Sequence, residues 1–151
     1  MEKAKKGELV STYQERLNQT PVNEGHWTGE RGESTFVSNK DEVRKILDDV
    51  NLEGIEYENA IPDFSPVSKG EVKITDMGID RNANFRQADE LLARELGKTR
   101  REIVKFRKEN KLTWHELNDM TSMQLVPSII NSKFGHLGGV SEVKKLLELL
   151  Q

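Results

Sequence analysis

The sequence predicts an α+β fold in which a small sheet packs against several helices. Residues 43–50 repeat apolar side chains at helical spacing, and residues 55–57 and 72–74 alternate as short strands. Residues 111–130 have the pattern of a hairpin followed by a helix. The chain has 151 residues, a length that suits one domain with room for a core and a site.

The expected elements follow one another along the chain. Residues 1–20 have the pattern of a polar helix ended by Thr20 and Pro21, and we expect a linker or spacer helix there. Residues 21–151 then form the domain. After the amphipathic helix near residues 43–50, one helix is expected from Asn84 to a stop at Gly97. The next starts at Thr99, three residues before Glu102, in a capping-box pattern.

The hairpin and its helix hold most of the residues that can carry chemistry. We expect strands at residues 111–116 and 123–126, and Pro127 presets the first turn of the helix that follows. Two of the three histidines in the chain, His115 and His136, lie in or just after this unit, with Asn131 between them and Glu116 beside the first. A hairpin folded onto a helix can bring the two imidazoles together, which is a nuclease-like constellation.

Composition limits the classes of function. With 34% hydrophobic residues, the chain has no apolar run near the roughly 20 residues needed to span a bilayer, so we expect no membrane segment in it. The absence of cysteine excludes disulfides, a thiolate zinc site and a cysteine nucleophile, and leaves His, Asp, Glu or Asn to hold any metal. No hydrophobic stretch follows the first six residues, so any export signal is expected upstream of this sequence.

Charge is distributed unevenly along the chain. The net charge of −3 argues against a generic nucleic-acid coat protein. Between residues 98 and 111, however, seven basic residues face only Glu102 and Glu109. This cluster either meets a phosphate backbone or forms a solvated helix face. The candidate nucleic-acid contacts within it are Arg100, Arg101, Lys105, Lys108 and Lys111.

Three strings carry a resemblance to a known family: Thr113-Trp114-His115-Glu116-Leu117-Asn118-Asp119, Met123-Gln124-Leu125-Val126-Pro127 and Gly135-His136-Leu137-Gly138-Gly139. Together they resemble the HNH/endonuclease VII superfamily, in particular the tryptophan-histidine branch found as C-terminal toxin domains of colicin-like and LXG-type polymorphic toxins. Residues 29–34, 61–65 and 84–89 are similar to the lead-in of those domains, so the resemblance covers most of residues 21–143. It implies a ββα-metal core at about residues 111–139, with additional helices and a small sheet.

The resemblance also implies roles for individual residues. His115 would be the general base, Asn131 would orient it or join the metal shell, and His136 would be a metal ligand. Glu116 is a candidate both for the catalytic group and for the metal ligands. It stands where many relatives have a second histidine, and as a ligand it would favour Mg or Mn over softer ions. Because neighbouring strand residues point to opposite faces, His115 and Glu116 share a metal only if the strand ends or bulges there. Asp119 and Arg31 are possible supporting residues, although a structural salt bridge is the first expectation for Arg31.

The function implied by the resemblance is a metal-dependent endonuclease with one divalent ion (Mg, Mn, Zn or Ni), with DNA favoured as substrate. It would be the toxic C-terminal domain of an antibacterial effector, delivered into the cytoplasm of a target bacterium and blocked by a cognate immunity protein. Two alternatives stay open. A metal-independent ribonuclease would use His115 and His136 as acid and base. A non-catalytic module would keep a degenerate HNH scaffold, and the histidines missing at Glu116 and Asn131 support that alternative.

Overall fold

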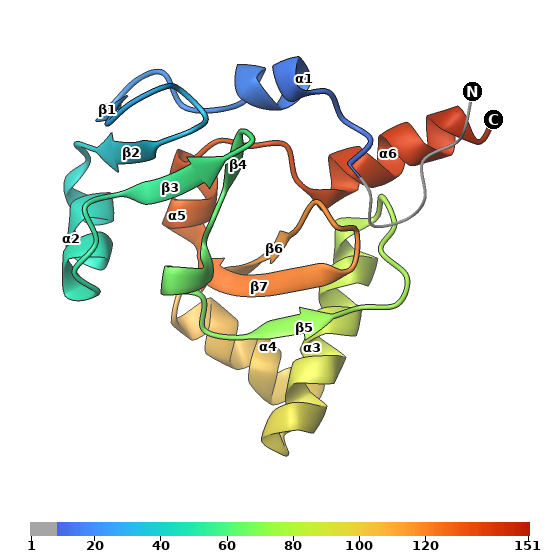
Figure 1. Ribbon diagram of the computed structural model, residues 1–151. Helices are drawn as coiled ribbons and strands as arrows, with labels where there is room; N and C mark the ends of the chain where they lie inside the picture. The colour runs from blue at the N-terminus through green and yellow to red at the C-terminus, as the bar shows by residue number, and fades with distance from the viewer. Residues whose placement is uncertain (1–8) are drawn as a thin grey trace.

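The structure is a computed structural model that describes residues 9–151 (Figure 1). Its helices are α1 (Tyr13–Asn18), α2 (Asp41–Asp49), α3 (Arg81–Leu96), α4 (Arg100–Glu109), α5 (Ser128–Lys133) and α6 (Gly139–Leu149), with a 3-10 turn at Ser65–Val67. Its strands are β1 (Gly25–Trp27), β2 (Thr35–Ser38), β3 (Ile55–Glu58), β4 (Ile61–Pro62), β5 (Glu71–Lys73), β6 (Leu112–Glu116) and β7 (Ser122–Pro127). The α+β class predicted from the sequence is confirmed.

The expected hairpin and helix form the centre of the fold. Strands β6 and β7 pair antiparallel, with His115 opposite Gln124, and α5 follows directly after Pro127. Strand β7 also pairs with β5 on its other side, so a three-stranded sheet has the order β5-β7-β6. A second sheet, with the order β1-β2-β3-β4, lies beside α2 and α5 (Figure 1).

Local signals set the ends of the central helices as expected. The side chain of Asp80 accepts hydrogen bonds from the amides of Asn82 and Ala83 and so begins α3. Gly97 ends that helix with a left-handed backbone, φ 65°, which glycine adopts without a steric penalty. Thr99 and Glu102 form the predicted capping box at the start of α4.

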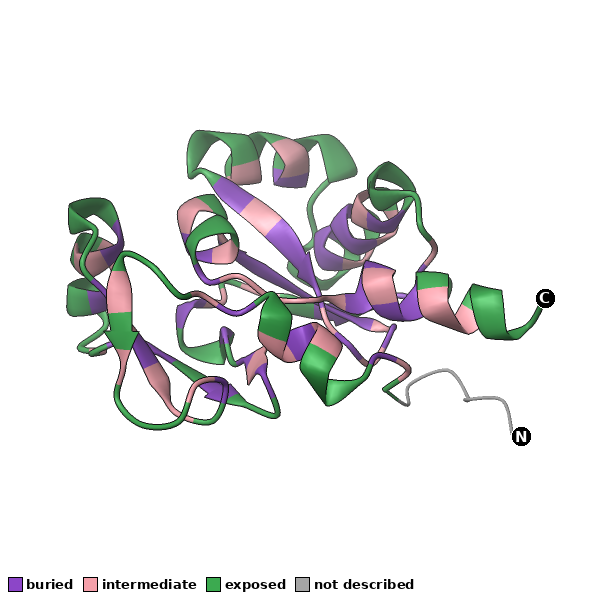
Figure 2. Cartoon of the chain, turned by 90° about the horizontal axis from the view of Figure 1, so that it is seen from above, coloured by how far each residue is buried: buried purple, intermediate pink, exposed green. Residues whose placement is uncertain are grey.

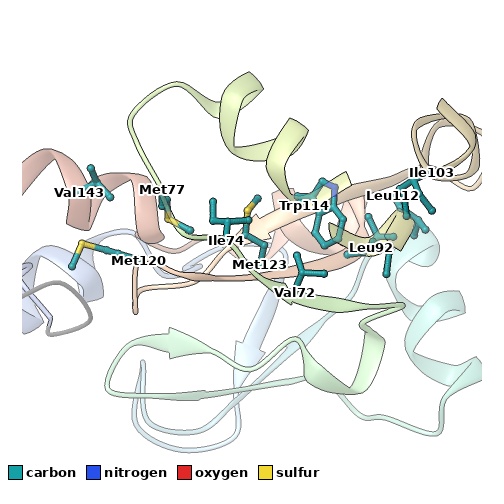
Figure 3. Close-up of a cluster of buried hydrophobic side chains, with 13 residues drawn as sticks. Val72, Ile74, Met77, Leu92, Ile103, Leu112, Trp114, Met120, Met123 and Val143 are labelled. Carbon is teal, nitrogen blue, oxygen red and sulfur yellow. The ribbon is translucent and has the colours of Figure 1, made fainter. Parts of the chain in front are cut away.

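Two hydrophobic cores lie on opposite faces of the central sheet, because side chains alternate along β7. Met123 and Leu125 point toward α3 and α4, where they join Trp114 in a cluster shown in Figure 3. Val126 points the other way and packs with residues of α2, α5 and the second sheet. Burial on both faces makes the strands of the hairpin almost wholly inaccessible, whereas the far end of α6 is exposed (Figure 2).

The sequence predicted a linker or spacer helix at residues 1–20, of which residues 1–8 lie outside the described part of the chain. From Leu9 to Thr20 the chain runs along α6 and the β3–β4 turn. The Arg16 side chain is 4% exposed and donates hydrogen bonds to the carbonyl oxygens of Ser11 and Asn59. No helix within residues 9–151 is long and apolar enough to cross a membrane.

Candidate active site

Strand β6 presents three consecutive side chains to two different environments. Trp114 is buried in the core beneath α3, where its indole Nε1 donates a 2.8 Å hydrogen bond to Asp89. Asp89 also forms a buried ion pair with Arg107 of α4. With Trp114 held on the α3 side, His115 points to the opposite face and Glu116 returns to the α3 side.

His115 is enclosed on its face of the sheet. The side chain is 2% exposed, and its ring centroid lies 4.8 Å from that of Phe64 and 4.8 Å from that of His136. Burial and, to a smaller extent, the nearby His136 lower the pKa of His115, and the Asn131 side chain beside the ring raises it, so that the pKa lies at about 3. His115 is therefore a neutral imidazole at pH 7. Phe64 and the loop that carries His136 cover the ring, so His115 is buried although it lies near the end of its strand.

His136 follows α5 and has a fixed tautomer. Its Nδ1 lies 2.7 Å from the carbonyl oxygen of Phe134. Since a carbonyl oxygen only accepts, Nδ1 must carry the proton, and Nε2 keeps a free lone pair. Burial lowers the pKa of His136, and the positive charge of Arg81 contributes to that decrease. This second imidazole is thus also neutral at pH 7 and has the form that metal ions bind.

Asn131 supplies a polar atom without a partner. It lies on α5, and its Oδ1 is buried and accepts no hydrogen bond from any residue within 9–151. Buried side-chain oxygens almost always have a partner, and the His115 ring lies beside this one, so the oxygen is available to a ligand or ion beside His115.

Glu116 is held by two residues of α3. Its Oε2 accepts a 2.8 Å hydrogen bond from Nδ2 of Asn84, and its Oε1 lies 3.4 Å from Nε of Arg81. The Asn84 amide cannot be flipped, because its Oδ1 accepts from the Gly78 amide at 2.9 Å. Burial raises the pKa of Glu116, while Asn84 and Arg81 partly offset that increase.

The two faces of β6 meet where the strand ends, at a cavity of about 190 Å³. Its lining includes His115, Asn131 and His136 from one side and Arg81 and Glu116 from the other, and residues 138–141 complete the wall. Close packing shapes this wall, since a Cβ on Gly138 would lie 2.9 Å from the Glu116 carbonyl oxygen. Most of the Arg81 side chain is exposed, so its guanidinium stands at the mouth.

The cavity contains three neutral donors that could hold a divalent metal ion. Within residues 9–151 no three His, Asp or Glu side chains are grouped so as to hold a metal. A ligand set must therefore use an amide oxygen. His115, His136 and the unpartnered Asn131 Oδ1 provide two nitrogens and one oxygen on the same side of β6. Neutral imidazoles and a neutral oxygen suit first-row ions such as Zn, Ni or Mn.

The other predicted site residues lie elsewhere. Asp119 accepts hydrogen bonds from Thr121 and Ser122 and holds the β6–β7 turn. Arg31 donates to Thr20 and to the Leu17 carbonyl oxygen. Neither residue lines the cavity.

The basic residues are distributed along α4. Arg100 and Arg101 lie at its start, and the 16-residue α3, about 24 Å long, separates them from Arg81 at the cavity. Lys108 and Lys111 line a larger, mostly apolar groove of about 1000 Å³ near the beginning of β6. Lys105 pairs with Glu109. The closeness of this cluster to His115 along the sequence thus does not bring it into the cavity.

Two residues of the site were not anticipated. Arg81 and Asn84 reach Glu116 from the first turns of α3, more than 30 residues earlier in the sequence. The only local signal near them is the cap at Asp80, which fixes where the helix begins but not what its first turns face.

A ββα unit with two facing imidazoles and an arginine–glutamate pair is the arrangement expected of a nuclease domain. The DNase/tRNase domain of colicin-like bacteriocins matches residues 54–138, more than half of the chain. The chain therefore belongs to this family and is a nuclease toxin domain. The match includes Arg81, Glu116, Asn131 and His136. Among curated proteins, none matches the chain.

Proposed function

We propose that this domain is a metal-dependent endonuclease that hydrolyses phosphodiester bonds, with DNA as the favoured substrate. The observation that carries the proposal is the cavity at the end of β6. There His115, His136 and the orphaned Asn131 oxygen lie opposite Arg81 and Glu116. Hydrolysis by water needs no 2′-hydroxyl, so this chemistry suits DNA as well as RNA.

In this proposal His115, Asn131 and His136 hold one divalent ion. The ion, when bound, would stabilise the negative charge that develops on the phosphorane and on the leaving oxygen. The protein prepares the ligands in advance, because the Phe134 carbonyl fixes His136 with Nε2 unprotonated and burial keeps both imidazoles neutral. Neither ring must lose a proton before it binds a cation at neutral pH.

We assign the general base to Glu116 in place of His115, the base that the family resemblance implied. A base works best when its pKa lies near the operating pH. A pKa of about 3 makes His115 a weak base, whereas burial moves the pKa of Glu116 toward neutrality. Asn84 and Arg81 each engage one oxygen of this carboxylate and so fix its orientation.

Arg81 is the proposed phosphate contact. Its guanidinium lies at the mouth of the cavity and has only one ion-pair contact within residues 9–151, the 3.4 Å approach to Glu116. Arginine presents a planar fork of donors that matches two phosphate oxygens. In this position it would bind the scissile phosphate and offset the charge that develops in the transition state.

The burial of both imidazoles supports this proposal over a metal-independent ribonuclease. Acid–base catalysis by two histidines requires one of them to be protonated. Burial lowers the pKa of both His115 and His136, so neither is a cation at neutral pH. A non-catalytic module would need no oriented carboxylate, yet Asn84 is fully buried and dedicated to Glu116 and Gly78.

The family supports a wider proposal about partners and place of action. We propose that the domain is the toxic part of a larger antibacterial effector, acts in the cytoplasm of the target bacterium and is blocked there by an immunity protein. Two surfaces are available to the nucleic acid or to an acidic inhibitor. One is the outer side of α4, with Arg100, Arg101 and Lys105, and the other is the groove with Lys108 and Lys111.

The test is cleavage of plasmid DNA and of total RNA by the purified chain, with and without excess EDTA. We expect cleavage that EDTA abolishes. Arg81→Ala should reduce the rate by roughly a hundredfold or more. Arg86→Ala is the matched control, because Arg86 lies on the same helix with similar exposure and pairs with Glu90 outside the cavity.

The assigned base is tested by a second pair of variants. Glu116→Gln should lower the rate by on the order of a hundredfold to ten-thousandfold, while Glu90→Gln on α3 should leave it unchanged. Full activity in excess EDTA would contradict the metal-dependent mechanism. Full activity of Glu116→Gln would return the base role to another residue.

A further inference from the structure

A segment that we call the N-terminal strap, residues 9–20, is fastened to α6 by a single buried carboxylate. Glu142 is fully buried and accepts hydrogen bonds from the amides of Val10 and Ser11 at 2.6 and 2.8 Å. The hydroxyl of Ser11 also donates to it. Three donors from two consecutive strap residues thus converge on one side chain.

The same carboxylate also holds the loop that carries His136. Asn118, in the β6–β7 turn, donates from its Nδ2 to Glu142 at 3.0 Å and to the carbonyl oxygen of Leu137 at 2.9 Å. Leu137 directly follows His136. Glu142 therefore links the strap, the turn after β6 and the site loop, residues 134–139, in one buried network.

The far end of the strap contacts the site loop directly. A Cβ placed on Gly135 would collide with the carbonyl oxygen of Gln19, so the strap backbone passes immediately against the residue before His136. On its other side the loop packs against the end of β6, since a Cβ on Gly139 would collide with the Leu117 carbonyl oxygen. The loop is thus enclosed between the strap and the end of the strand that carries His115.

From these contacts we infer that Glu142 is a positioning residue that holds the strap against the site loop and so keeps His136 directed into the cavity. This inference rests on the proposed function for its catalytic consequence, but its structural content is independent of it. The strap then belongs to the nuclease domain and is not the linker that its polar sequence indicates. Val10 of the strap packs, partly buried, against the core of the β5-β7-β6 sheet. Release of the strap would free the loop and remove this one contact, while the rest of the core keeps the sheet folded.

The test compares variants of the full chain that loosen the network from both sides. Glu142→Gln leaves strap donors unmatched, and Ser11→Ala is a milder change that removes one donor from the strap itself. Lys145→Ala is the matched control, because Lys145 bridges to Glu15 on the outside of the same interface. Val43→Ala, on the buried face of α2, serves as a control for general loss of stability.

The primary measurement is amide hydrogen exchange of residues 134–139, together with the imidazole NMR signals of His136. In Glu142→Gln we expect loop exchange to accelerate by roughly tenfold or more, while the amides of β7 stay protected. Ser11→Ala should give a smaller change of the same kind, and Lys145→Ala none. The affinity for Zn²⁺ by calorimetry should fall in the same order.

Two results would overturn the inference. Unchanged loop exchange in Glu142→Gln would show that the strap does not hold the loop. If Glu142→Gln accelerated amide exchange equally in the loop and in β7, as we expect of Val43→Ala, Glu142 would contribute only to global stability. Hydrogen exchange needs neither metal nor substrate. A wild-type chain without nuclease activity would therefore overturn the proposed function, while the exchange experiment would still test the role of Glu142.

Discussion

Acidification from pH 8 to pH 5 should destabilise the metal-free domain through His115. The buried ring has a pKa of about 3 in the folded chain, against an ordinary value of 6.5. Between these two values the unfolded chain binds a proton that the folded chain does not. The contribution of the neutral His115 ring to the free energy of unfolding is therefore fully present above pH 6.5 and is lost as the pH falls toward 3.

The two pKa values set the size of the effect. At pH 5, about 2 kcal/mol of the free energy of unfolding is lost relative to pH 8. The lowered pKa of His136 adds a loss of the same sign. The raised pKa of Glu116 acts in the opposite direction, because its carboxyl protonates more easily in the folded chain. Asp119 and Glu142, whose hydrogen bonds outweigh burial and lower their pKa, lose their contribution mainly below pH 5.

The assay is urea unfolding at pH 8 and pH 5, followed by tryptophan fluorescence in the presence of EDTA, for the wild type and for His115→Gln. The variant lacks the titrating ring and should lose about 2 kcal/mol less than the wild type over the same interval. An equal loss in both proteins would refute the reasoning. It would mean either that His115 is accessible to protons in the folded state or that other groups dominate.

Three further predictions concern the metal, the core and the basic helix. Asn131→Leu should weaken Zn²⁺ binding by roughly tenfold or more in calorimetry and leave the melting temperature unchanged or higher, because the Asn131 oxygen has no partner within residues 9–151. Asp89→Asn should lower the free energy of unfolding in urea by about 3 kcal/mol, since it leaves the largely buried Arg107 unpaired. Charge reversal of Arg101, Lys105 and Lys108 should reduce the salt dependence of DNA binding, measured by fluorescence anisotropy on a Glu116→Gln background. The logarithmic slope should fall by about 0.9 for each phosphate that the variant no longer neutralises. A slope equal to that of the Glu116→Gln parent would remove α4 from the substrate path.

The hairpin and its helix were predictable because every signal for them is local. Alternation along β6, the turn at Asp119 and the fixed backbone of Pro127 all lie within about 20 residues of one another. The same local unit brings His115, Asn131 and His136 together. Sequence spacing was therefore sufficient to predict which of these side chains meet.

The remainder of the site depends on contacts between distant segments. Arg81 and Asn84 reach Glu116 only because α3 packs across the face of the sheet that Trp114 occupies. Phe64, which covers His115, comes from the turn before β5. Periodicity along one segment indicates which side is apolar, but not which other segment covers it.

In two regions the sequence pattern gives the wrong prediction about which residues lie close together in space. The basic residues of α4 immediately precede the hairpin in sequence, yet the length of α3 places Arg100 and Arg101 far from Arg81. The strap has the polar composition of a linker, but its Arg16 and Ser11 are buried because Asn59 and Glu142 supply partners. In both cases the deciding contact lies outside the segment that carries the pattern.

Trp114, in the core on the α3 side of the sheet, anchors the arrangement of the site. Trp114 fills the space beneath α3 and bonds to Asp89, so the register of β6 against β7 is fixed by a side chain that takes no part in catalysis. A slip of one residue would exchange the two faces of the strand. The His115 ring would then face Asn84 and Arg81, and the Glu116 carboxylate would face His136. Strand alternation about Trp114 therefore places the proposed metal ligands and the proposed base on different faces of β6. The hydrogen bond between Trp114 and Asp89 stabilises the domain and, by fixing this register, also orders the site.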